Sequence, residues 1–578
     1  MKSPEKYPLP ERIGDPNLLT GRENEFEDFE QWLAGIPKKL SKSRVILGRR
    51  KSGKTAFVQR IFNRLWSEQG EIIPLYFTFP EKKIWYPEFA IQYYRTFASQ
   101  YISFLEKNEE MVRSPMTLDQ IEEYGRSNSI DPLVVDIEWL NRNEEKKRYD
   151  LMWETAYSAP DRFAAFFDRR ILVIIDEFQY IGTCVYRDVT KQNADETLPG
   201  SYHDVVESKL APMLVTGSYV GWMVNLMASY LEAGRLDRYY MAPYLTREEG
   251  LFSIYRYAEI YDTPITNETA EQINSLCMSD PFFISCIFRS KYRGKDLTAR
   301  KGVIETVDYE ITGRHSGLSA TWKEYIDKTV KRINDANAKN ILLHLSKNAD
   351  REWTPKELKE KLQLDLSKNE IHERLNLMRE SDLIEEGGSD SHYKGLKDGT
   401  LYLVLRNRFE GEITGYAPDL KNDFNEKLEQ LKEERRSLKG KLGNLVGKFA
   451  EYQLATEFRV KKRFLLSDFF LNVKDKKRLN IIDVRLREKF QRSDGKEMEV
   501  DVVAKSDCGR VVVVEVKKRK KKTGIGDIRD FFEKTEVYAK KYPKKKILPA
   551  FLSVGGFTAP ARKLCEDRGI GFAENIFA

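Results

Sequence analysis

An eight-residue stretch from Gly48 to Thr55 constrains the fold of this chain more than any other feature. Its sequence, GRRKSGKT, fits the pattern G-x-x-x-x-G-K-[ST] of a phosphate-binding loop, or P-loop. Residues 44–47 before it predict a short buried strand, and residues 56–62 after it predict a helix. Glycines let the backbone turn its N–H groups toward phosphate, and the N-terminus of the helix adds positive potential. Strand, loop and helix in this order predict an α/β domain that binds a nucleotide.

Every residue of this loop is a candidate nucleotide-binding residue: Gly48, Arg49, Arg50, Lys51, Ser52, Gly53, Lys54 and Thr55. We expect Lys54 to contact the β- and γ-phosphates of ATP. The Thr55 hydroxyl is the expected protein ligand of Mg²⁺. The loop therefore predicts ATP and Mg²⁺ as cofactors.

A second strand signal ends in two acidic residues. Residues 171–175 form an unbroken apolar run, which is typical of a central parallel strand buried on both faces. Asp176 and Glu177 follow at its end, where open α/β sheets bind ligands. We expect Asp176 to hold Mg²⁺, directly or through water, and Glu177 to polarise the attacking water as a catalytic residue.

Polar residues also follow the next predicted strand, residues 212–216. Thr216 and Ser218 either sense the γ-phosphate or are ordinary residues of a turn. Arg235 follows a helix-like run and is a candidate nucleotide sensor or inter-subunit finger. The alternative for Arg235 is a solvated surface arginine.

The motifs of the N-terminal half resemble those of archaeal-type ATPases, in the STAND/AAA+ group of P-loop NTPases. The family's G-R-x-x-E entry matches Gly21 to Glu25, ahead of the P-loop. The runs IIDEFQY at 174–180 and VTGS at 215–218 follow in the family's order. The resemblance covers about residues 14–300.

This resemblance implies a fold and a lid. The expected fold is a five-stranded parallel sheet within residues 1–243, followed by a helical lid at 244–328 that closes over the nucleotide. Residues 80–168 have mostly helical periodicity and look like an insertion in the sheet domain.

Residues 329–412 have the pattern of a winged helix, of the helix-turn-helix class. Three helices are predicted. The first spans residues 338–345. The second starts after Thr354, its N-cap, with Pro355 at the first helical position, and the third spans residues 371–381 after a capping box. The predicted strands of the hairpin wing are residues 383–388 and 400–405. The candidate recognition helix mixes basic and acidic residues, so DNA contact and a structural or oligomerisation role both stay open.

Residues 413–440 are a charged, helix-favouring run that indicates a connector. The last predicted domain, residues 441–578, opens with an amphipathic helix at 445–454. Two strands, 497–504 and 510–517, are then predicted to form a hairpin.

The alternation along this hairpin predicts a cation site. Side chains two residues apart share one face of a strand, so Glu515 and Lys517 point the same way. The hairpin brings Asp501 beside Glu515, and two close carboxylates repel each other unless a cation lies between them. We therefore expect Mg²⁺ or Mn²⁺ at this pair. Lys517 would orient a water or stabilise a pentavalent phosphorus.

The C-terminal domain resembles the PD-(D/E)XK nucleases, which have a restriction-endonuclease-like α/β fold. The matching residues are Asp501, Glu515 and Lys517, and the helix acid of the family matches Glu451. The resemblance implies that Glu451, Asp501 and Glu515 bind metal, and that Asp501, Glu515 and Lys517 hydrolyse a phosphodiester. The alternative is a surface hairpin with ordinary alternating charges.

Charge points to DNA as a partner of this end of the chain. The net charge is +7, and the excess of Lys and Arg is concentrated after about residue 420. The basic run 518–522 suits contact with a phosphate backbone. The five cysteines show no C-x-x-C pair, and no apolar run approaches the ~18 residues of a membrane span. We therefore expect a cytoplasmic protein with free thiols.

Together these patterns predict a multidomain α/β protein that binds and hydrolyses ATP. ATP would gate or power metal-dependent cleavage of DNA by the C-terminal domain. The alternative is a nucleotide-driven switch or a remodelling ATPase whose nuclease-like domain only binds nucleic acid. Expected partners include a second copy, because an Arg235 finger needs a neighbour, and a protein on the winged helix or on insertion 80–168.

Overall fold

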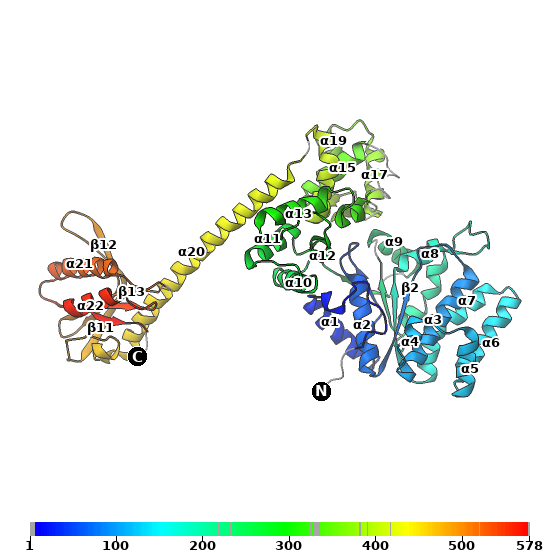
Figure 1. Cartoon of the computed structure of the whole chain (residues 1–578), viewed down its shortest axis with the longest axis horizontal. Coiled ribbons are helices and arrows are strands. Elements are labelled where there is room, and N and C mark those ends of the chain that lie inside the picture. Colours follow the sequence, from blue (N-terminus) through cyan, green and yellow to red (C-terminus); the bar gives the residue numbers. More distant parts are fainter. Residues whose placement is uncertain are drawn as a thin grey trace. The chain divides into compact units, whose positions relative to one another are not determined.

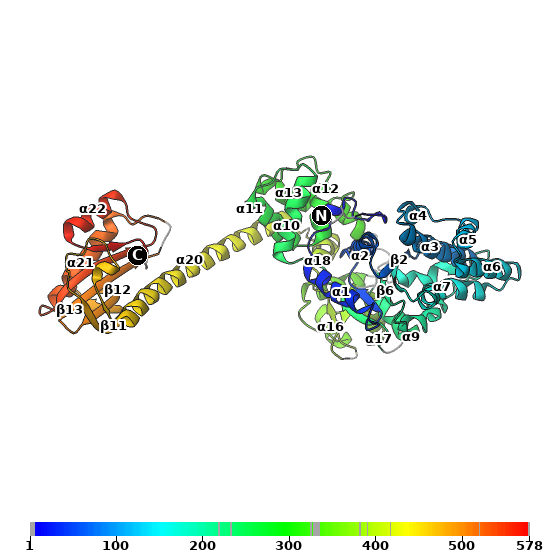
Figure 2. The same cartoon turned by 90° about the horizontal axis from the view of Figure 1, so that it is seen from below.

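The computed structural model describes residues 6–217, 220–231, 234–323, 326, 336–380, 383–389, 391–416, 418–518 and 521–575. Ser218, Ser381 and two residues of the basic run, Arg519 and Lys520, lie outside these ranges. Backbone contacts divide the chain into two compact units, Met1–Glu426 and Lys427–Ala578, drawn in Figures 1 and 2. No helix in the described ranges has both the length and the hydrophobicity needed to cross a membrane.

A parallel sheet is the centre of the N-terminal unit. In the described residues it has five strands in the order β2-β4-β6-β1-β7. They are β1 (Arg44–Leu47), β2 (Ile72–Thr78), β4 (Arg170–Asp176), β6 (Met213–Thr216) and β7 (Asp237–Tyr240). Every neighbouring pair is parallel, which confirms the predicted sheet. The carboxyl ends of the strands therefore lie along one edge.

The predicted insertion at 80–168 is largely helical, in agreement with its periodicity. Its helices are α3 (Tyr86–Glu106), α4 (Glu110–Arg113), α5 (Leu118–Ser127), α6 (Asp131–Glu145) and α7 (Tyr149–Phe166). Arg162 of α7 donates hydrogen bonds of 2.9 and 3.0 Å to the buried carboxylate of Asp136 on α6. A short parallel pair, β3 (Ile84–Trp85) and β5 (Val185–Tyr186), joins the start of the insertion to the chain after β4.

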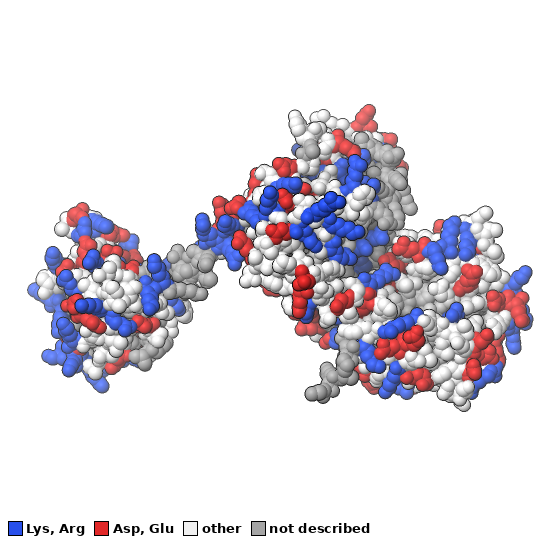
Figure 3. Space-filling model, viewed as in Figure 1, with Lys and Arg blue, Asp and Glu red and all other residues white. Residues whose placement is uncertain are grey.

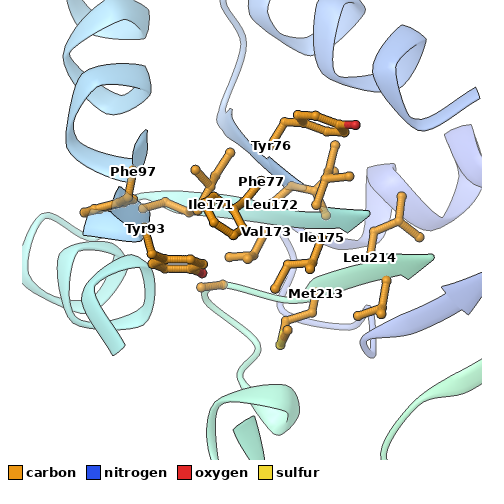
Figure 4. Packing of buried hydrophobic residues seen from close by; sticks show 14 of the residues in the cluster. Tyr76, Phe77, Tyr93, Phe97, Ile171, Leu172, Val173, Ile175, Met213 and Leu214 are labelled. Carbon is orange, nitrogen blue, oxygen red and sulfur yellow. The ribbon is translucent and has the colours of Figure 1, made fainter. Parts of the chain in front are cut away.

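Helices cover both faces of the sheet, as a parallel sheet requires. The helix after the P-loop is α2 (Lys54–Glu68), and α1 (Glu23–Gly35) precedes β1. Successive side chains of a strand point to opposite faces, so Tyr76 of β2 contacts Phe62 of α2 while Phe77 contacts Tyr93 of α3. Figure 4 shows Tyr76, Phe77 and Tyr93 around the apolar side chains of β4 and β6. The side chains from Ile171 to Ile175 are at most 4% exposed, which explains their unbroken apolar run.

Helices follow β7, where the lid was expected, and four of them are described over their whole length. They are α10 (Arg247–Ile260), α11 (Asn267–Cys277), α12 (Pro281–Arg289) and α13 (Arg300–Thr312). Side-chain caps fix the starts of the first three: Thr246 and Thr266 each close a capping box, and the Asp280 carboxylate accepts from the Phe282 and Phe283 amides of α12. Closure over a nucleotide stays a prediction.

The next segment contains three helices and a hairpin: α15 (Ala336–Lys347), α16 (Pro355–Leu362), α17 (Lys368–Glu380), β8 (Ile384–Glu386) and β9 (Tyr393–Gly395). The prediction of a wing strand at residues 400–405 is wrong. These residues belong to α18 (Gly399–Leu405), which is followed by the short α19 (Gly411–Thr414). Asp398 caps α18 by accepting from the Leu401 amide at 3.0 Å, and this capped start favours a helix for the apolar run that follows.

The C-terminal unit is a six-stranded mixed sheet with helices on both faces. Its elements are α20 (Leu420–Lys461), which begins before the boundary at residue 427, β10 (Arg463–Phe464), β11 (Leu479–Gln491), β12 (Glu497–Ser506), β13 (Arg510–Lys517), α21 (Ile525–Lys541), β14 (Lys546–Ser553), α22 (Ala559–Arg568) and β15 (Gly571–Ala573). In the described residues the strand order follows the chain from β10 to β15. The first three pairs are antiparallel and the last two are parallel.

Two apolar clusters occupy the two faces of this sheet. Val512 and Val514 of β13 pack with Leu454 and other residues of α20, whereas Val511 and Val513 lie in the cluster of α21 and α22.

The predicted hairpin of β12 and β13 is confirmed. The predicted connector and the helix predicted at 445–454 are one continuous helix, α20. On the face drawn in Figure 3, Lys and Arg side chains of this unit are interspersed with Asp and Glu.

Candidate functional sites

The P-loop connects the end of β1 to the start of α2. Gly53 has φ of 95°, a left-handed conformation that favours glycine. Gly48 has no room for a side chain, since a Cβ there would lie 3.0 Å from the carbonyl oxygen of Met241. Lys54 is only 5% exposed, and its Nζ donates to the carbonyls of Gly48 at 2.5 Å and Arg49 at 2.9 Å. The ammonium group therefore lies across its own loop.

A pocket of about 320 Å³ opens beside the loop. Its polar lining residues include Arg12, Arg50, Lys51, Ser52, Gly53, Lys54, Thr55, Glu177 and Arg289. Its apolar lining residues include Ile13, Leu18, Leu19, Leu245, Tyr257, Tyr261 and Phe282. A cationic side next to an apolar side suits a ligand that joins phosphates to a flat ring.

Asp176 is the centre of a buried hydrogen-bond network at the carboxyl edge of the sheet. The side chain is 1% exposed. Its Oδ2 accepts from Thr55 Oγ1 at 3.0 Å and from the Tyr76 hydroxyl at 3.1 Å, and its Oδ1 accepts from the Thr216 hydroxyl. A buried carboxylate requires such partners. The structure thus brings together three predicted site residues: Thr55 in the first turn of α2, Asp176 at the end of β4 and Thr216 at the end of β6.

The donor set at Asp176 suits Mg²⁺, which prefers oxygen ligands. Thr55 supplies a hydroxyl and Asp176 a carboxylate beside the phosphate-binding loop. Tyr76 is a member of this network that the sequence analysis missed. Burial, and next the charge of Asp176, raise the pKa of the Tyr76 hydroxyl well above its usual range, so it stays a neutral donor.

Glu177 follows β4 directly and has φ of 57°, a left-handed conformation that is uncommon for a non-glycine residue. This turn places its side chain at the pocket. Gln179 Nε2 donates to Glu177 Oε2 at 2.5 Å, which holds the carboxylate in place. Glu177 therefore lines the same pocket as the P-loop, and its catalytic role stays a prediction.

Arg49 does not line the pocket, although the motif made it a nucleotide-binding candidate. Its Nη2 donates to Asp280 Oδ2 at 2.5 Å, and its Nε lies 2.8 Å from Asp398 Oδ2. The rings of Tyr244 and Trp322 lie 5.5 Å from the guanidinium carbon. Burial alone would lower the pKa of Arg49, but Asp280 and Asp398 outweigh it and raise the pKa. Arg49 therefore connects the loop to the caps of α12 and α18.

Arg235 lies away from the pocket of its own chain. It comes just before β7, at the amino edge of the parallel sheet, whereas the P-loop lies at the carboxyl edge. Its Nε is 3.4 Å from Glu207 Oε1. The expectation that Arg235 contacts nucleotide within this chain is therefore not met.

Arg289 is a pocket residue that the sequence analysis missed. It lies in the last turn of the lid helix α12, and its Nη2 donates to Ser285 Oγ at 2.8 Å. It brings a cation to the pocket from a helix outside the P-loop motif. A single arginine in a helix has no motif spacing, so only the folded chain identifies it.

A second site lies where β12 and β13 end their pairing in the C-terminal unit. The ladder runs from Lys505↔Val511 to Val502↔Val514, which places Asp501 and Glu515 at the next opposed positions. Asp501 Oδ2 accepts from the Val516 amide at 2.7 Å. The pKa of Asp501 is raised to about 7, mainly because the carboxyl is buried and next because the charge of Glu515 is close. The predicted acidic pair is thus brought together, and its charges oppose each other.

Two lysines balance the Glu515 carboxylate, whose side chain is 6% exposed. Lys517 Nζ lies 3.0 Å from Glu515 Oε1, as the alternation of β13 predicted. Burial acts to lower the pKa of Lys517, but Glu515 and then Asp501 outweigh it and raise the pKa. Lys534 of α21, which the sequence analysis missed, donates 2.9 Å hydrogen bonds to both oxygens of Glu515.

Glu451, the third predicted metal ligand, is paired with Arg487. The guanidinium donates to its two oxygens at 2.8 and 3.0 Å. Among the described residues, no group of three or more His, Cys, Asp or Glu side chains is placed to hold a metal. The acidic pair fits a divalent cation in chemistry, since a cation would relieve the opposition that raises the pKa of Asp501. Glu451 would join it only after leaving Arg487.

The first of these sites, a strand, a P-loop and a helix within a parallel sheet, has the arrangement of the P-loop fold. No protein-family model matches this chain, and a search of curated proteins finds no similar sequence. Solved structures do show similarity. The Walker-type ATPase PABY2304 of Pyrococcus abyssi is 15% identical with a TM-score of 0.46, over 69% of this chain and 98% of that chain.

Two further structures are similar at lower scores. The ORC2 protein of Aeropyrum pernix, in its ADP form, is 13% identical with a TM-score of 0.39, over 71% of this chain and 97% of that chain. A repair endonuclease from Pyrococcus abyssi is 22% identical with a TM-score of 0.14, over 17% of this chain and 39% of that chain. None of the three reaches a TM-score of 0.5, so function is inferred from the geometry of the two sites.

Proposed function

We propose that the N-terminal unit binds ATP with Mg²⁺ and hydrolyses it. The observation that best supports this is the 3.0 Å hydrogen bond from Thr55 Oγ1 to Asp176 Oδ2 beside the P-loop. A hydroxyl and a carboxylate side by side are oxygen donors suited to Mg²⁺. When bound, Mg²⁺ would neutralise charge on the phosphate oxygens.

The residues of the chain have distinct roles in this proposal. Lys54 exchanges its two carbonyl partners in the loop for phosphate oxygens of the nucleotide. Glu177, held by Gln179, orients and polarises the attacking water. Arg289 adds positive charge from the lid side of the pocket.

Replacement of Lys54 by Ala tests this proposal. We expect Lys54→Ala to lose ATP binding and turnover, because the phosphates lose their point charge. Lys38→Ala, which removes an exposed lysine outside the pocket, is the matched control and should bind ATP normally. Normal ATP affinity and turnover in Lys54→Ala would reject the P-loop assignment.

We further propose that the C-terminal unit hydrolyses phosphodiester bonds of DNA with a divalent cation. The supporting observation is the buried pair of Asp501 and Glu515 with Lys517 beside it. A bound Mg²⁺ or Mn²⁺ would act as a Lewis acid and lower the pKa of its water. Lys517 would place its ammonium group next to the phosphate oxygens that gain charge during attack.

Cleavage assays on single- and double-stranded DNA and RNA, with Mg²⁺ or Mn²⁺ and with or without ATP, test the second proposal. We expect metal-dependent cleavage of DNA that Asp501→Asn or Glu515→Gln abolishes, while ATP turnover persists. Glu497→Gln, an exposed acid on the same strand β12, is the control. If the wild-type chain cleaves no nucleic acid under any of these conditions, the alternative of a binding-only switch or remodelling ATPase is the better one.

ATP would gate or power cleavage in the complete protein. In that case Lys54→Ala changes the rate of DNA cleavage, although both catalytic acids of the C-terminal unit are intact.

Residues 336–395, three helices followed by the β8-β9 hairpin, are proposed as a winged helix that contacts DNA or a protein partner. Lys368 and Arg374 on α17 are the candidate basic contacts of that domain.

A further inference from the structure

Helix α20 has an apolar stripe that none of the proposed functions uses. The stripe consists of Leu431, Leu438, Leu445, Phe449 and Tyr452, which are 36%, 64%, 65%, 61% and 56% exposed. Large apolar side chains exposed in a contiguous row are uncommon on a chain that stands alone. From sequence, residues 413–440 were expected to be a charged connector and residues 445–454 an amphipathic helix.

The stripe repeats every seven residues. Leu431, Leu438, Leu445 and Tyr452 are each seven positions apart, which places them at the d positions of a heptad. The corresponding a positions are Leu428, Arg435, Leu442 and Phe449. Leu428 is already buried within its own chain. Apart from Arg435, the a and d positions from Leu431 to Tyr452 are apolar, which is the pattern of a coiled coil.

The opposite face of α20 is already used by its own unit. Ala450, Leu454 and Phe458 are buried in the apolar cluster of the C-terminal sheet. Counted in the same heptads, these three residues fall at b, f and c, on the side of the helix away from a and d. Phe449 and Tyr452 therefore stay exposed even where the helix packs on its sheet.

The charges next to the stripe favour a second copy of this chain in parallel orientation. Arg435 is the single charged residue at an a position, and a polar residue there fixes register and partner number. In a parallel pair in register, an a side chain lies beside the preceding g side chain of the other helix. Glu434 occupies that g position, so Arg435 of each copy would face Glu434 of the other. In an antiparallel pair Arg435 would face apolar layers.

The helix itself also benefits from a partner. Gly440, Gly443 and Gly447 lie within α20, and each glycine weakens a helix relative to alanine. All three fall at b and f positions of the heptads, outside the a and d stripe. A pairing that buries the stripe offsets this weakness without requiring a side chain at any of them.

We propose that α20 pairs with α20 of a second copy of this chain as a parallel, two-stranded coiled coil along residues 431–452. The proposal does not depend on ATP hydrolysis or DNA cleavage by either unit. It predicts a homodimer in the absence of nucleotide and nucleic acid.

Sedimentation equilibrium of the full-length chain tests the dimer. We expect a mass of twice 67.5 kDa, and about a hundredfold weaker association for the variant Leu438→Glu/Leu445→Glu. Ser437→Glu, at an exposed c position of the same turn, is the control and should stay dimeric. Circular dichroism of each variant checks that the fold is retained. A monomeric wild type, or a dimer that the double variant leaves unchanged, overturns the proposal.

Disulfide cross-linking tests the orientation with a variant that keeps the stripe apolar. In the background Cys508→Ser, which removes the exposed cysteine, we expect Leu438→Cys to form a cross-linked dimer on oxidation. In a parallel pair in register, residue 438 lies opposite its own copy. A dimer that does not cross-link through residue 438 overturns the parallel arrangement. A mass of three or more chains, or a monomer whose stripe binds only DNA or another protein, overturns the two-stranded homodimer.

Discussion

The guanidinium of Arg49 donates to the carboxylate of Asp280 at 2.5 Å, which joins the phosphate-binding loop to the start of lid helix α12. Asp280 also accepts from the Thr400 hydroxyl at 2.8 Å and caps α12. Arg49 makes a second ion pair, with the α18 cap Asp398 at 2.8 Å. A change in the conformation of the loop would therefore alter the ion pairs at two helix caps in the same unit.

We predict that Arg49→Met destabilises the N-terminal unit by about 3 kcal/mol, because two buried carboxylates lose their cation. Arg49→Lys should recover only part of this, since a single ammonium cannot reach both carboxylates as a planar guanidinium does. Urea unfolding of the full-length chain measures the effect. Wild-type stability in Arg49→Met would contradict the structural role of this residue.

Two substitutions in the Asp176 network test the proposed metal ligand separately from the stability of the fold. We predict that Asp176→Asn lowers ATP turnover about a hundredfold, because the carboxylate proposed to hold Mg²⁺ is lost. Tyr76→Phe removes one hydrogen bond to the same carboxylate and should cost about 1 kcal/mol of stability while ATP turnover stays within a few-fold. Steady-state ATPase assays and thermal melting separate the two effects. Equal turnover in both variants would speak against Asp176 as a metal ligand.

The two predicted sites were accessible from sequence because their residues are local in pattern. The P-loop is contiguous, and Asp176 and Thr216 follow strands whose carboxyl ends a parallel sheet must align. Asp501 and Glu515 could be paired because strand alternation and one short turn fix the register of a hairpin.

The missed residues approach their sites from elements other than those that carry the sequence motifs. Lys534 comes from α21, Arg289 from α12, and the partners of Arg49 are helix caps more than 200 positions away. No periodicity links such residues, since tertiary packing alone brings them together. The false wing strand at 400–405 had a local reason, since a short apolar run suits a strand or a buried helix and the cap at Asp398 that selects the helix was not considered.

The raised pKa of Asp501 predicts a pH dependence of stability in metal-free buffer. The folded unit keeps this carboxyl protonated up to about pH 7, whereas the unfolded chain releases the proton near its ordinary value of 3.8. Between these values the folded state binds more protons, so the contribution of Asp501 to stability is lost as pH rises through about 7. The expected loss between pH 4 and pH 7 is about 4 kcal/mol.

Asp501→Asn should remove this dependence and be more stable than wild type at pH 8 in the presence of EDTA. Mn²⁺ should stabilise the wild type more at pH 8 than at pH 5, because the cation favours the ionised pair. Urea unfolding, followed by hydrogen exchange in β12 and β13, reports on this unit within the full-length chain. A wild type whose stability rises between pH 5 and 8 relative to Asp501→Asn would refute the raised pKa.

Lys534 occupies both oxygens of Glu515 and so competes with a divalent cation for the same carboxylate. We predict that Lys534→Met destabilises the metal-free unit by about 2 kcal/mol, because a buried carboxylate loses its bidentate partner. The same change should tighten Mn²⁺ binding about five-fold, since one positive charge is removed from the site. Lys534→Arg keeps the charge and should match the wild type in both measurements. Isothermal titration with Mn²⁺ and urea unfolding with and without the cation decide the matter. If Lys534→Met loses stability but binds Mn²⁺ as the wild type does, Lys534 stabilises the fold and does not compete with a cation for Glu515.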